Sequence, residues 1–365
     1  MGLACGIVGL PNVGKSTLFN AVTLSEEANR SDYMFSTTEP IRGSVSVPDP
    51  RLAKIAEFIP TQRLVPAQMT VVDIPGLVSG SSHGEGMGIS FLGAIKESDV
   101  LLHVVRCFDK EGVQHVSGSI DPAADAEIVE LELMQADLQT VERNLERVAK
   151  KAKGGDKESI ALQEVLGVAK THLDQSQPLR TAVFGERERA LLKPLFLMTI
   201  KPVLFVANVG DNDVEGKSAH AQELRAYAER TQASCMHLCA DIEAELVRMT
   251  ADERAMFMAD LGLKEQGLIR LIHAGFDLLG LQTFFTAGEK EVKAWVIHKG
   301  DTAPIGAGVI HTDFVKKFIR AEVYRYEDLV ALGTEAAIKA AGKLRIEGKD
   351  YVLQDGDVCH FLIGG

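Results

Sequence analysis

The chain has 365 residues, a formal net charge of −12 and 46% hydrophobic residues. This length suits two or three domains, and the acidic balance argues against nucleic-acid binding by the whole surface. No apolar run reaches the roughly 18–20 residues that cross a bilayer, and Met1 precedes an apolar run without the features of a signal peptide. The five scattered cysteines complete no zinc or disulfide pattern. We therefore expect a cytoplasmic protein with reduced thiols and no membrane partner.

Residues 9–16 read GLPNVGKS, which matches the phosphate-binding pattern G-x-x-x-x-G-K-[ST]. Residues 4–8 are apolar and predict a buried strand, and residues 17–23 predict a helix. In this order of strand, turn and helix, backbone N–H groups surround a β-phosphate and Lys15 reaches the β and γ oxygens. The Ser16 hydroxyl is the expected Mg²⁺ ligand. The motif predicts that the chain binds a nucleoside triphosphate.

A second motif, DIPG at residues 73–76, follows the apolar run 69–72. In a P-loop fold, Asp73 holds Mg²⁺ through water and the Gly76 N–H senses the γ-phosphate. Between the two motifs, the pair Thr37-Thr38 offers a threonine hydroxyl that completes the Mg²⁺ shell, from Thr37 or from its neighbour. These features favour a GTPase-like switch over a motor or transporter ATPase, and they disfavour a small-molecule kinase, which shares only the P-loop.

Residues 100–105 predict another buried strand, in which we expect His103 to be a core or strand-end residue rather than a ligand. The pattern then becomes helical. From residue 125 to about 153, apolar residues recur at spacings of 3 and 4 and predict a seam of Leu131, Met134, Leu138, Val141, Leu145 and Val148.

The Gly-Gly pair at residues 154–155 ends this helical pattern, and a second one follows. Its apolar face is predicted to hold Leu162, Val165, Ala169 and Leu173. Two such helices joined by a tight turn form an antiparallel hairpin. The pattern fits an arm that contacts a partner and equally a subdomain that only packs on its host.

The motif that would read the base begins at Asn208, after a predicted strand at residues 203–207. GTPases carry N-K-x-D here: the Asp accepts from the guanine N1–H and amino group, and the Lys packs along the ring. Val209 replaces that lysine, which favours ATP. Asp211 suits guanine and repels the N1 lone pair of adenine, which favours some GTP binding. We predict that ATP is preferred, and the last base-side loop is expected at residues 239–241.

The C-terminal part, residues 281–365, differs from the rest of the chain in its pattern of short apolar runs separated by turn residues. This pattern predicts a small α/β domain. It contains 11 Lys/Arg and 12 Asp/Glu and so carries only −1 of the formal charge. Strands are predicted at residues 292–297 and 351–353, and a helix at residues 313–329.

In a helix over residues 313–329, Lys316, Lys317 and Arg320 would lie on one basic edge. The charge pattern alone is equally typical of a solvated helix face. A nearly neutral domain is, however, the part of an acidic protein that can approach RNA phosphates without repulsion.

These motifs, in this order, resemble the YchF/Obg-like ATPase family over essentially the whole chain. Further markers are GEGMG at residues 84–88, FFTAG at 284–288, the pair Ala294-Trp295, IHTDF at 310–314 and EGKDY at 347–351. The resemblance implies an α/β P-loop G domain with a doubly wound, mostly parallel sheet at residues 1–122 and 202–280. It also implies an inserted antiparallel helical hairpin (a coiled coil) at 123–201 and a C-terminal β-grasp TGS domain at 281–365.

The resemblance further implies Mg²⁺-dependent hydrolysis of ATP and binding to the large ribosomal subunit, with RNA contact through the TGS domain. We expect a monomer. Ser16 and Thr37 would ligate Mg²⁺, while Asn208 and Val209 would contact the base. The phosphates would be bound by Asn12, Val13, Gly14, Lys15, Ser16 and Thr17.

Leu77 stands where Ras-like GTPases carry a water-orienting Gln, so we expect slow turnover. His83, in the following glycine-rich loop, is a candidate for orienting the water, although a lone loop histidine is more often a surface residue. The Asn12 side chain lies where some related enzymes help to hold K⁺ against the phosphates, so K⁺ is a second candidate cofactor. The alternative function is an Obg-type GTPase that uses Asp211 to read guanine.

Overall fold

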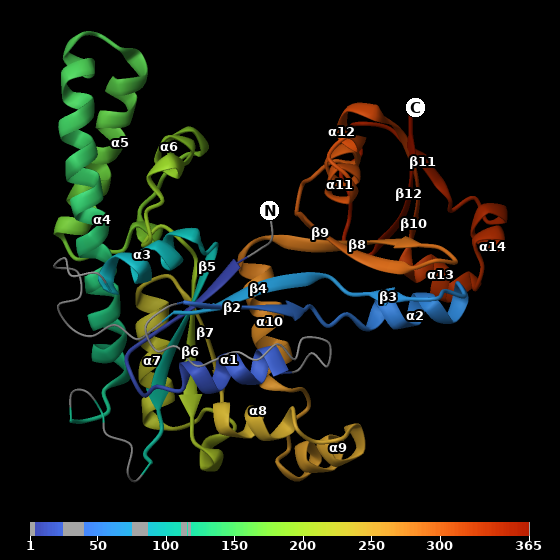
Figure 1. The fold of residues 1–365 in the computed structure, drawn as a ribbon, viewed down its shortest axis with the longest axis horizontal. Helices are drawn as coiled ribbons and strands as arrows, with labels where there is room; N and C mark the ends of the chain where they lie inside the picture. Colours follow the sequence, from blue (N-terminus) through green and yellow to red (C-terminus); the bar gives the residue numbers. More distant parts are fainter. Residues whose placement is uncertain (1–3, 25–39, 75–86, 111–114, 116–117, 365) are drawn as a thin grey trace. The chain divides into compact units, whose positions relative to one another are not determined.

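The computed structural model describes residues 4–24, 40–74, 87–110, 115 and 118–364 (Figure 1). The chain divides into two compact units. The first comprises residues 1–45 and 70–271, and the second comprises residues 46–69 and 272–365. The second unit therefore contains a segment from the N-terminal part of the chain, which the sequence analysis does not predict.

The first unit is built on a six-stranded sheet with the order β2-β4-β1-β5-β6-β7. The strand β1 pairs in parallel with β4 and β5, and β5, β6 and β7 continue in parallel. The strand order reverses at β1, and ligands of such sheets bind beyond the carboxyl ends of the strands at this reversal. The strands are β1 (Ala4–Val8), β2 (Ile41–Ser46), β4 (Gln68–Asp73), β5 (Val100–Cys107), β6 (Val203–Val209) and β7 (Ser234–Leu238).

The strands predicted for this unit are confirmed. Every residue of β5 and of β6 is buried, as continuous apolar runs of parallel strands require. His103 lies in β5 with its ring centroid 5.0 Å from that of Phe205, and burial lowers the pKa of its imidazole to about 3. It is a neutral core residue, as expected.

The described part of the first unit also contains α-helices and three 3₁₀ turns. None of the helices in the described ranges combines the length and apolarity needed to span a membrane. The α-helices are α1 (Lys15–Leu24), α3 (Met87–Glu97), α4 (Pro122–Lys153), α5 (Lys157–Asp174), α6 (Glu186–Leu192), α7 (Ala219–Arg230), α8 (Ala240–Leu246) and α9 (Ala251–Asp260), and α10 (Gly267–Leu278) crosses into the second unit. The 3₁₀ turns are η2 (Leu179–Thr181), η3 (Lys193–Leu195) and η4 (Asp211–Asp213).

Helices α4 and α5 pack along each other as a long hairpin, green in Figure 1. Gly154 ends α4, and Asp156 starts α5 by accepting a hydrogen bond from the Ser159 N–H. Gly155 between them has φ +84°, a left-handed conformation that favours glycine. The core of the hairpin contains Met134, Leu138, Val141, Leu145, Val148, Leu162, Val165, Ala169 and Leu173.

Leu131 is not part of this seam, so its assignment is wrong. Its side chain is 41% exposed, whereas Val129, Glu130 and Leu133 beside it are buried. The reason is that the first half of α4 packs against β5 and α7 rather than against α5 alone, so the buried face of the helix differs between its two halves. A single heptad register does not describe both halves.

The second unit contains a mixed sheet with the order β11-β10-β12-β8-β9-β3. Strands β12 and β8 pair in parallel, as do β3 and β9, and the other pairs in the sheet whose direction is resolved are antiparallel. The elements are α2 (Pro50–Phe58), β3 (Leu64–Val65), β8 (Leu281–Ala287), β9 (Val292–His298), α11 (Ala303–Ile310), α12 (Phe314–Lys317), β10 (Phe318–Arg325), α13 (Tyr326–Leu332), α14 (Glu335–Ala340), β11 (Arg345–Glu347) and β12 (Asp357–Ile363).

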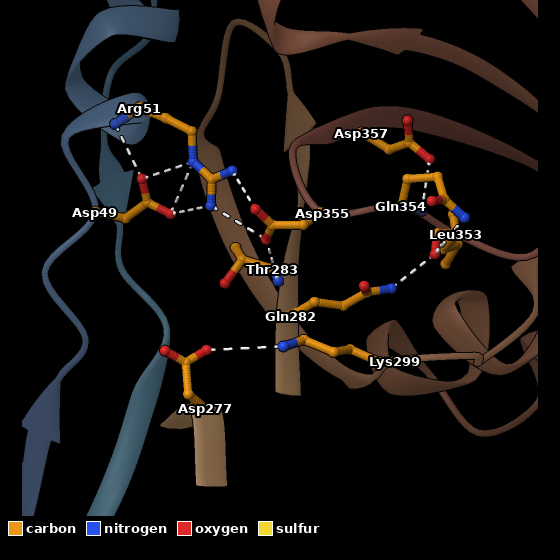
Figure 2. Close-up of polar contacts among 10 residues, drawn as sticks. All are labelled: Asp49, Arg51, Asp277, Gln282, Thr283, Lys299, Leu353, Gln354, Asp355 and Asp357. Carbon is orange, nitrogen blue, oxygen red and sulfur yellow. Dashed lines mark hydrogen bonds and ion pairs between the residues drawn. The ribbon is translucent and has the colours of Figure 1, made fainter. Parts of the chain in front are cut away.

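Arg51 joins the two segments of this unit (Figure 2). Its guanidinium donates to Asp49 at 2.8 Å and to Asp355 at 2.7 Å, and it lies 5.2 Å from the ring centroid of Phe285. The Asp355 carboxylate also accepts the Thr283 N–H at 3.0 Å. Arg51 and Asp355 are 304 positions apart in the chain, so this cluster fixes residues 46–69 to the C-terminal segment.

The predicted helix over residues 313–329 is wrong. Only Phe314–Lys317 is helical before the strand β10 begins at Phe318, and α13 begins at Tyr326. A bulge between Phe318 and Arg320 shifts the pairing of β10 with β12, which hides the alternation that marks a strand. Lys316 and Lys317 therefore lie in α12 and Arg320 in β10. All three are exposed, but they do not form one helix edge.

The predicted strand at residues 351–353 is also absent. Val352 makes only an isolated bridge with Thr302. The Leu353 N–H donates to the Asp301 carbonyl, and the Leu353 carbonyl accepts from the side chain of Gln282 (Figure 2). Because these partners come from separate segments, the apolar run forms a loop in which Leu353 is buried and Val352 is exposed, rather than a strand.

Candidate functional site

The loop at residues 9–14 lies between the end of β1 and the start of α1, at the reversal of the strand order. Two of its glycines are required by their surroundings. Gly9 has φ +148°, and a Cβ there would lie 2.3 Å from the Val104 carbonyl oxygen. Gly14 has φ +97°, and a Cβ there would lie 2.3 Å from the Asn208 Nδ2. The loop therefore follows a path that only glycine permits at these positions.

Lys15 begins α1 and is 6% exposed. Its Nζ donates to the Leu10 carbonyl oxygen at 2.6 Å, its only hydrogen-bond partner among the described residues. Burial lowers the pKa of Lys15 to about 8, against the opposing attraction of Asp73. A buried ammonium with one of its three donors used is suited to bind an anion at this loop.

Ser16 and Asp73, two of the predicted metal ligands, are in direct contact. The Ser16 Oγ donates to the Asp73 Oδ2 at 2.9 Å. Asp73 is 8% exposed, and burial raises the pKa of its carboxyl, opposed by the Ser16 hydrogen bond and by Lys15. Its other oxygen, Oδ1, is buried with no hydrogen-bond partner in the described part of the chain. A hydroxyl beside a carboxylate with an open oxygen fits a hard divalent cation such as Mg²⁺.

Asn208 holds the phosphate loop against the loop that follows β7. Its Nδ2 donates to the Val13 carbonyl oxygen at 2.9 Å, and its Oδ1 accepts the Ala240 N–H at 2.9 Å. The side chain is buried, so both hydrogen bonds are protected from water. Asn208 is therefore a clamp between two loops, a role that the sequence analysis does not predict.

The other predicted base-side residues differ in exposure. Val209 is 1% exposed and pairs with Cys107 in the sheet, while Asp211 begins η4 and is exposed. A contact that sequence reasoning missed lies nearby: Lys110, after β5, forms an ion pair with Asp241, in the first turn of α8, at 2.7 Å. The residues of this pair are 131 positions apart, so no local signal links them.

The structure thus brings Lys15, Ser16, Asp73 and Asn208 together with Val13 and Gly14 at one end of the sheet. Asn12 has φ +62° and an exposed side chain, and Thr17 is half-buried at the start of α1. The remaining predicted residues, Thr37, Gly76 and His83, lie outside the described residues, as does Leu77.

Two family models match the chain. Residues 4–151 match the family described as "50S ribosome-binding GTPase". Residues 281–364 match the family YchF-GTPase_C, described as "Protein of unknown function (DUF933)".

Full-length relatives decide the family. The chain is 47% identical over 363 residues to "Ribosome-binding ATPase YchF" of Bacillus subtilis, covering 99% of both chains, and 48% identical over 364 residues to the protein of the same name from Escherichia coli O157:H7, again covering 99% of both. The chain belongs to the YchF family. A solved member, the "Schizosaccharomyces pombe YchF GTPase", is 35% identical, covers 99% of this chain and 98% of its own, and superposes with a TM-score of 0.86.

Membership of the YchF family confirms the resemblance found in the sequence and the α/β fold with a P-loop G domain. Within the described residues, no group of three or more His, Cys, Asp or Glu side chains could hold a metal ion. The candidate cation site is instead one hydroxyl beside one carboxylate, those of Ser16 and Asp73. Such a site fits a cation whose remaining ligands are water and phosphate oxygens, as is usual for Mg²⁺.

Proposed function

We propose that this YchF-family chain is a Mg²⁺-dependent P-loop nucleoside triphosphatase that hydrolyses ATP slowly and binds the ribosome according to its nucleotide state. The observation that carries the proposal is a pair of buried groups beyond the ends of β1 and β4. Among the described residues, the Lys15 ammonium uses one of its three donors, and the Asp73 Oδ1 has no hydrogen-bond partner. Buried polar groups are normally satisfied within the protein. These two have opposite charge, as a triphosphate with its cation requires. The names of the bacterial relatives, ribosome-binding ATPases, support the same function.

In this proposal the P-loop residues surround the phosphates, and Lys15 contacts the β and γ oxygens. Ser16, Thr37 and Asp73 hold the cation, directly or through water, and the Gly76 N–H contacts the γ-phosphate. Mg²⁺ supplies charge neutralisation at the phosphates when bound. His83 remains the candidate for orienting the water, since the side chain of Leu77 has no polar atom. The phosphate-binding residues are Asn12, Val13, Gly14, Lys15, Ser16 and Thr17.

The base is proposed to lie beside Asn208, Val209 and Asp211. Two observations point in different directions. Val209 supplies no cation to pack along a guanine ring, which favours ATP, whereas Asp211 presents an exposed carboxylate that suits guanine. The names of the relatives differ likewise, since the bacterial proteins are called ATPases and the fission-yeast protein a GTPase. ATP is the proposed substrate, and an Obg-type GTPase is the second candidate.

A calorimetric titration with AMPPNP and GMPPNP in the presence of Mg²⁺ tests this assignment. We expect tighter binding of AMPPNP, and we expect Asp211→Ala to weaken the remaining GMPPNP binding because it removes the guanine acceptor. A wild-type preference for GMPPNP of tenfold, about 1.4 kcal/mol, would reassign the chain as a GTPase. Binding of neither nucleotide would exclude both functions.

The ribosome contact is proposed to lie in the second unit, which we interpret as a TGS domain extended by residues 46–69, with the α4–α5 hairpin as a second contact. Lys316, Lys317 and Arg320 are exposed there, and the segment from residue 281 is nearly neutral. Changing all three to Glu should weaken co-sedimentation with ribosomes and leave nucleotide affinity unchanged. Undiminished co-sedimentation would remove this surface from the proposal.

A further inference from the structure

Three loops of the first unit meet at the base side of the proposed nucleotide site. Strands β5, β6 and β7 are parallel neighbours, so their carboxyl ends lie at the same edge of the sheet. Lys110 follows β5, Asp211 follows β6 and Asp241 follows β7. The last loop is positioned by Asn208, which accepts the N–H of Ala240, directly before Asp241.

Lys110 is the cation of this group. Its Nζ lies 2.7 Å from the Asp241 Oδ2, and the side chains of both residues are more than half exposed. The hydrogen bond and the charge of Asp241 raise the pKa of Lys110, and Asp211 adds a smaller attraction. The Asp211 carboxylate itself has no hydrogen-bond or ion-pair partner in the described part of the chain. The Lys110 ammonium thus attracts both carboxylates but forms an ion pair only with Asp241.

We propose that Lys110, held by Asp241, determines the choice of purine by offsetting the carboxylate of Asp211. The inference rests on the proposed function, because it concerns the base of the bound nucleotide. Guanine presents N1–H and an amino group as donors, whereas adenine presents a lone pair at N1. A carboxylate near this edge attracts guanine and repels adenine, and a nearby ammonium weakens both effects. Lys110 therefore acts through its charge on Asp211, unlike the motif lysine of GTPases, which packs along the guanine ring.

Two substitutions should shift the preference in opposite directions. Lys110→Met keeps most of the side chain but removes the positive charge. The negative charges of Asp211 and Asp241 are then no longer offset by a nearby cation, which should favour guanine. Asp241→Asn releases Lys110 to approach Asp211, which should favour adenine. Because the pair is exposed, we expect each shift in the ratio of the two dissociation constants to be about two- to fivefold.

The test measures the binding of AMPPNP and GMPPNP to the full chain by calorimetry with Mg²⁺, for the wild type and both variants. Lys54→Met is the matched control, since Lys54 forms an exposed ion pair with Glu57 at 2.6 Å in the second unit. We expect an unchanged ratio for the control, opposite shifts for the two variants, and shifts that shrink in high salt because exposed charges are screened. Unchanged ratios, or shifts in the same direction, would overturn the inference while leaving the proposed function intact. Binding of neither analogue by the wild type would instead overturn the proposed function.

Discussion

Two lysines at opposite ends of the same sheet, the buried Lys15 and the half-buried Lys201, differ in how many partners the protein gives them. Lys15 lies beyond the carboxyl end of β1, and its Nζ donates to one carbonyl, that of Leu10. Lys201 lies before the amino end of β6, and its Nζ donates to three carbonyls, those of Ile95, Lys96 and Ser98. In both cases burial lowers the pKa of the ammonium to about 8.

The difference indicates which lysine belongs to a ligand site. The three carbonyls around Lys201 lie at and just beyond the C-terminal turn of α3, where a helix leaves its carbonyls without partners and a cation is favourable. Lys201 therefore completes a structural contact. Within the described ranges, the buried Lys15 has two donors without a partner and lies near the Asp73 carboxylate, one oxygen of which is also unpaired there. The lowered pKa does not separate the two lysines, whereas the number of protein partners does.

The largest expected effect is the loss of triphosphate binding in Lys15→Ala. No other cation of the phosphate loop is placed to meet the β and γ oxygens, so we expect AMPPNP affinity to fall at least about 100-fold. The thermal stability of the nucleotide-free protein should be unchanged or higher, because the substitution removes the cost of burying an ammonium. Calorimetry and thermal unfolding measure the two quantities, and unchanged affinity would remove the nucleotide site from this loop.

Lys201→Met is the matched substitution at the other end of the sheet. We expect it to lower the free energy of unfolding by about 1–3 kcal/mol, because three carbonyls at the end of α3 lose a charged donor. Nucleotide affinity should be retained in the folded protein. A chemical denaturation curve and an AMPPNP titration check both parts. A variant that loses affinity but not stability would contradict the structural role of Lys201.

The sequence predicts the site of Lys15 better than that of Lys201, because the residues that form the first site are close together in the chain and those that form the second are far apart. The strand, the glycine turn and the helix around residues 9–16 are local, and so is the D-x-x-G motif that contains Asp73. The partners of Lys201 are more than 100 positions away, and those of Arg51 in the second unit are up to 304 away. Likewise Asn208 is recognisable as part of a motif, but its hydrogen bonds to Val13 and Ala240 depend on the fold.

Misread elements of the fold have a similar cause. Residues 313–329 mix aromatic, apolar and basic side chains, which is the basis for predicting a helix there. The bulge in β10 shifts the pairing between Phe318 and Arg320, so the strand lacks the regular alternation that would mark it in the sequence. The residue Leu131 fits the heptad spacing of α4 but lies on the half of the helix that packs against the sheet. Local periodicity predicts that an element exists, and the identity of its neighbour decides which residues it buries.

The pH dependence of binding should follow the lowered pKa of Lys15. Only the charged form attracts the triphosphate, so affinity should fall about tenfold between pH 7 and pH 9, as a group with a pKa of about 8 loses its proton. The stability of the nucleotide-free protein should change in the opposite direction. Between pH 8 and pH 10.5 the unfolded chain binds more protons at this lysine than the folded chain, so its contribution to the free energy of unfolding rises with pH.

The control for this pH dependence is Lys15→Ala, whose residual affinity should not vary over the same range. Lys201→Met should retain the wild-type dependence, because the ammonium that it lacks does not contact the nucleotide. Equal pH profiles for wild type and Lys15→Ala would show that another group is responsible.

The smallest expected effect concerns the monovalent cation. Asn12 stands in the phosphate loop at φ +62° with an exposed side chain, where its amide oxygen can help to hold K⁺ against the phosphates. The added positive charge would stabilise the transition state, as an arginine does in other P-loop enzymes. We expect ATP hydrolysis to be severalfold faster in K⁺ than in Na⁺. Asn12→Gly removes the amide without straining the left-handed backbone, so it should abolish the difference while the fold persists. Equal wild-type rates in the two salts would exclude this role of Asn12, and a K⁺ effect that survives in Asn12→Gly would place the ion elsewhere.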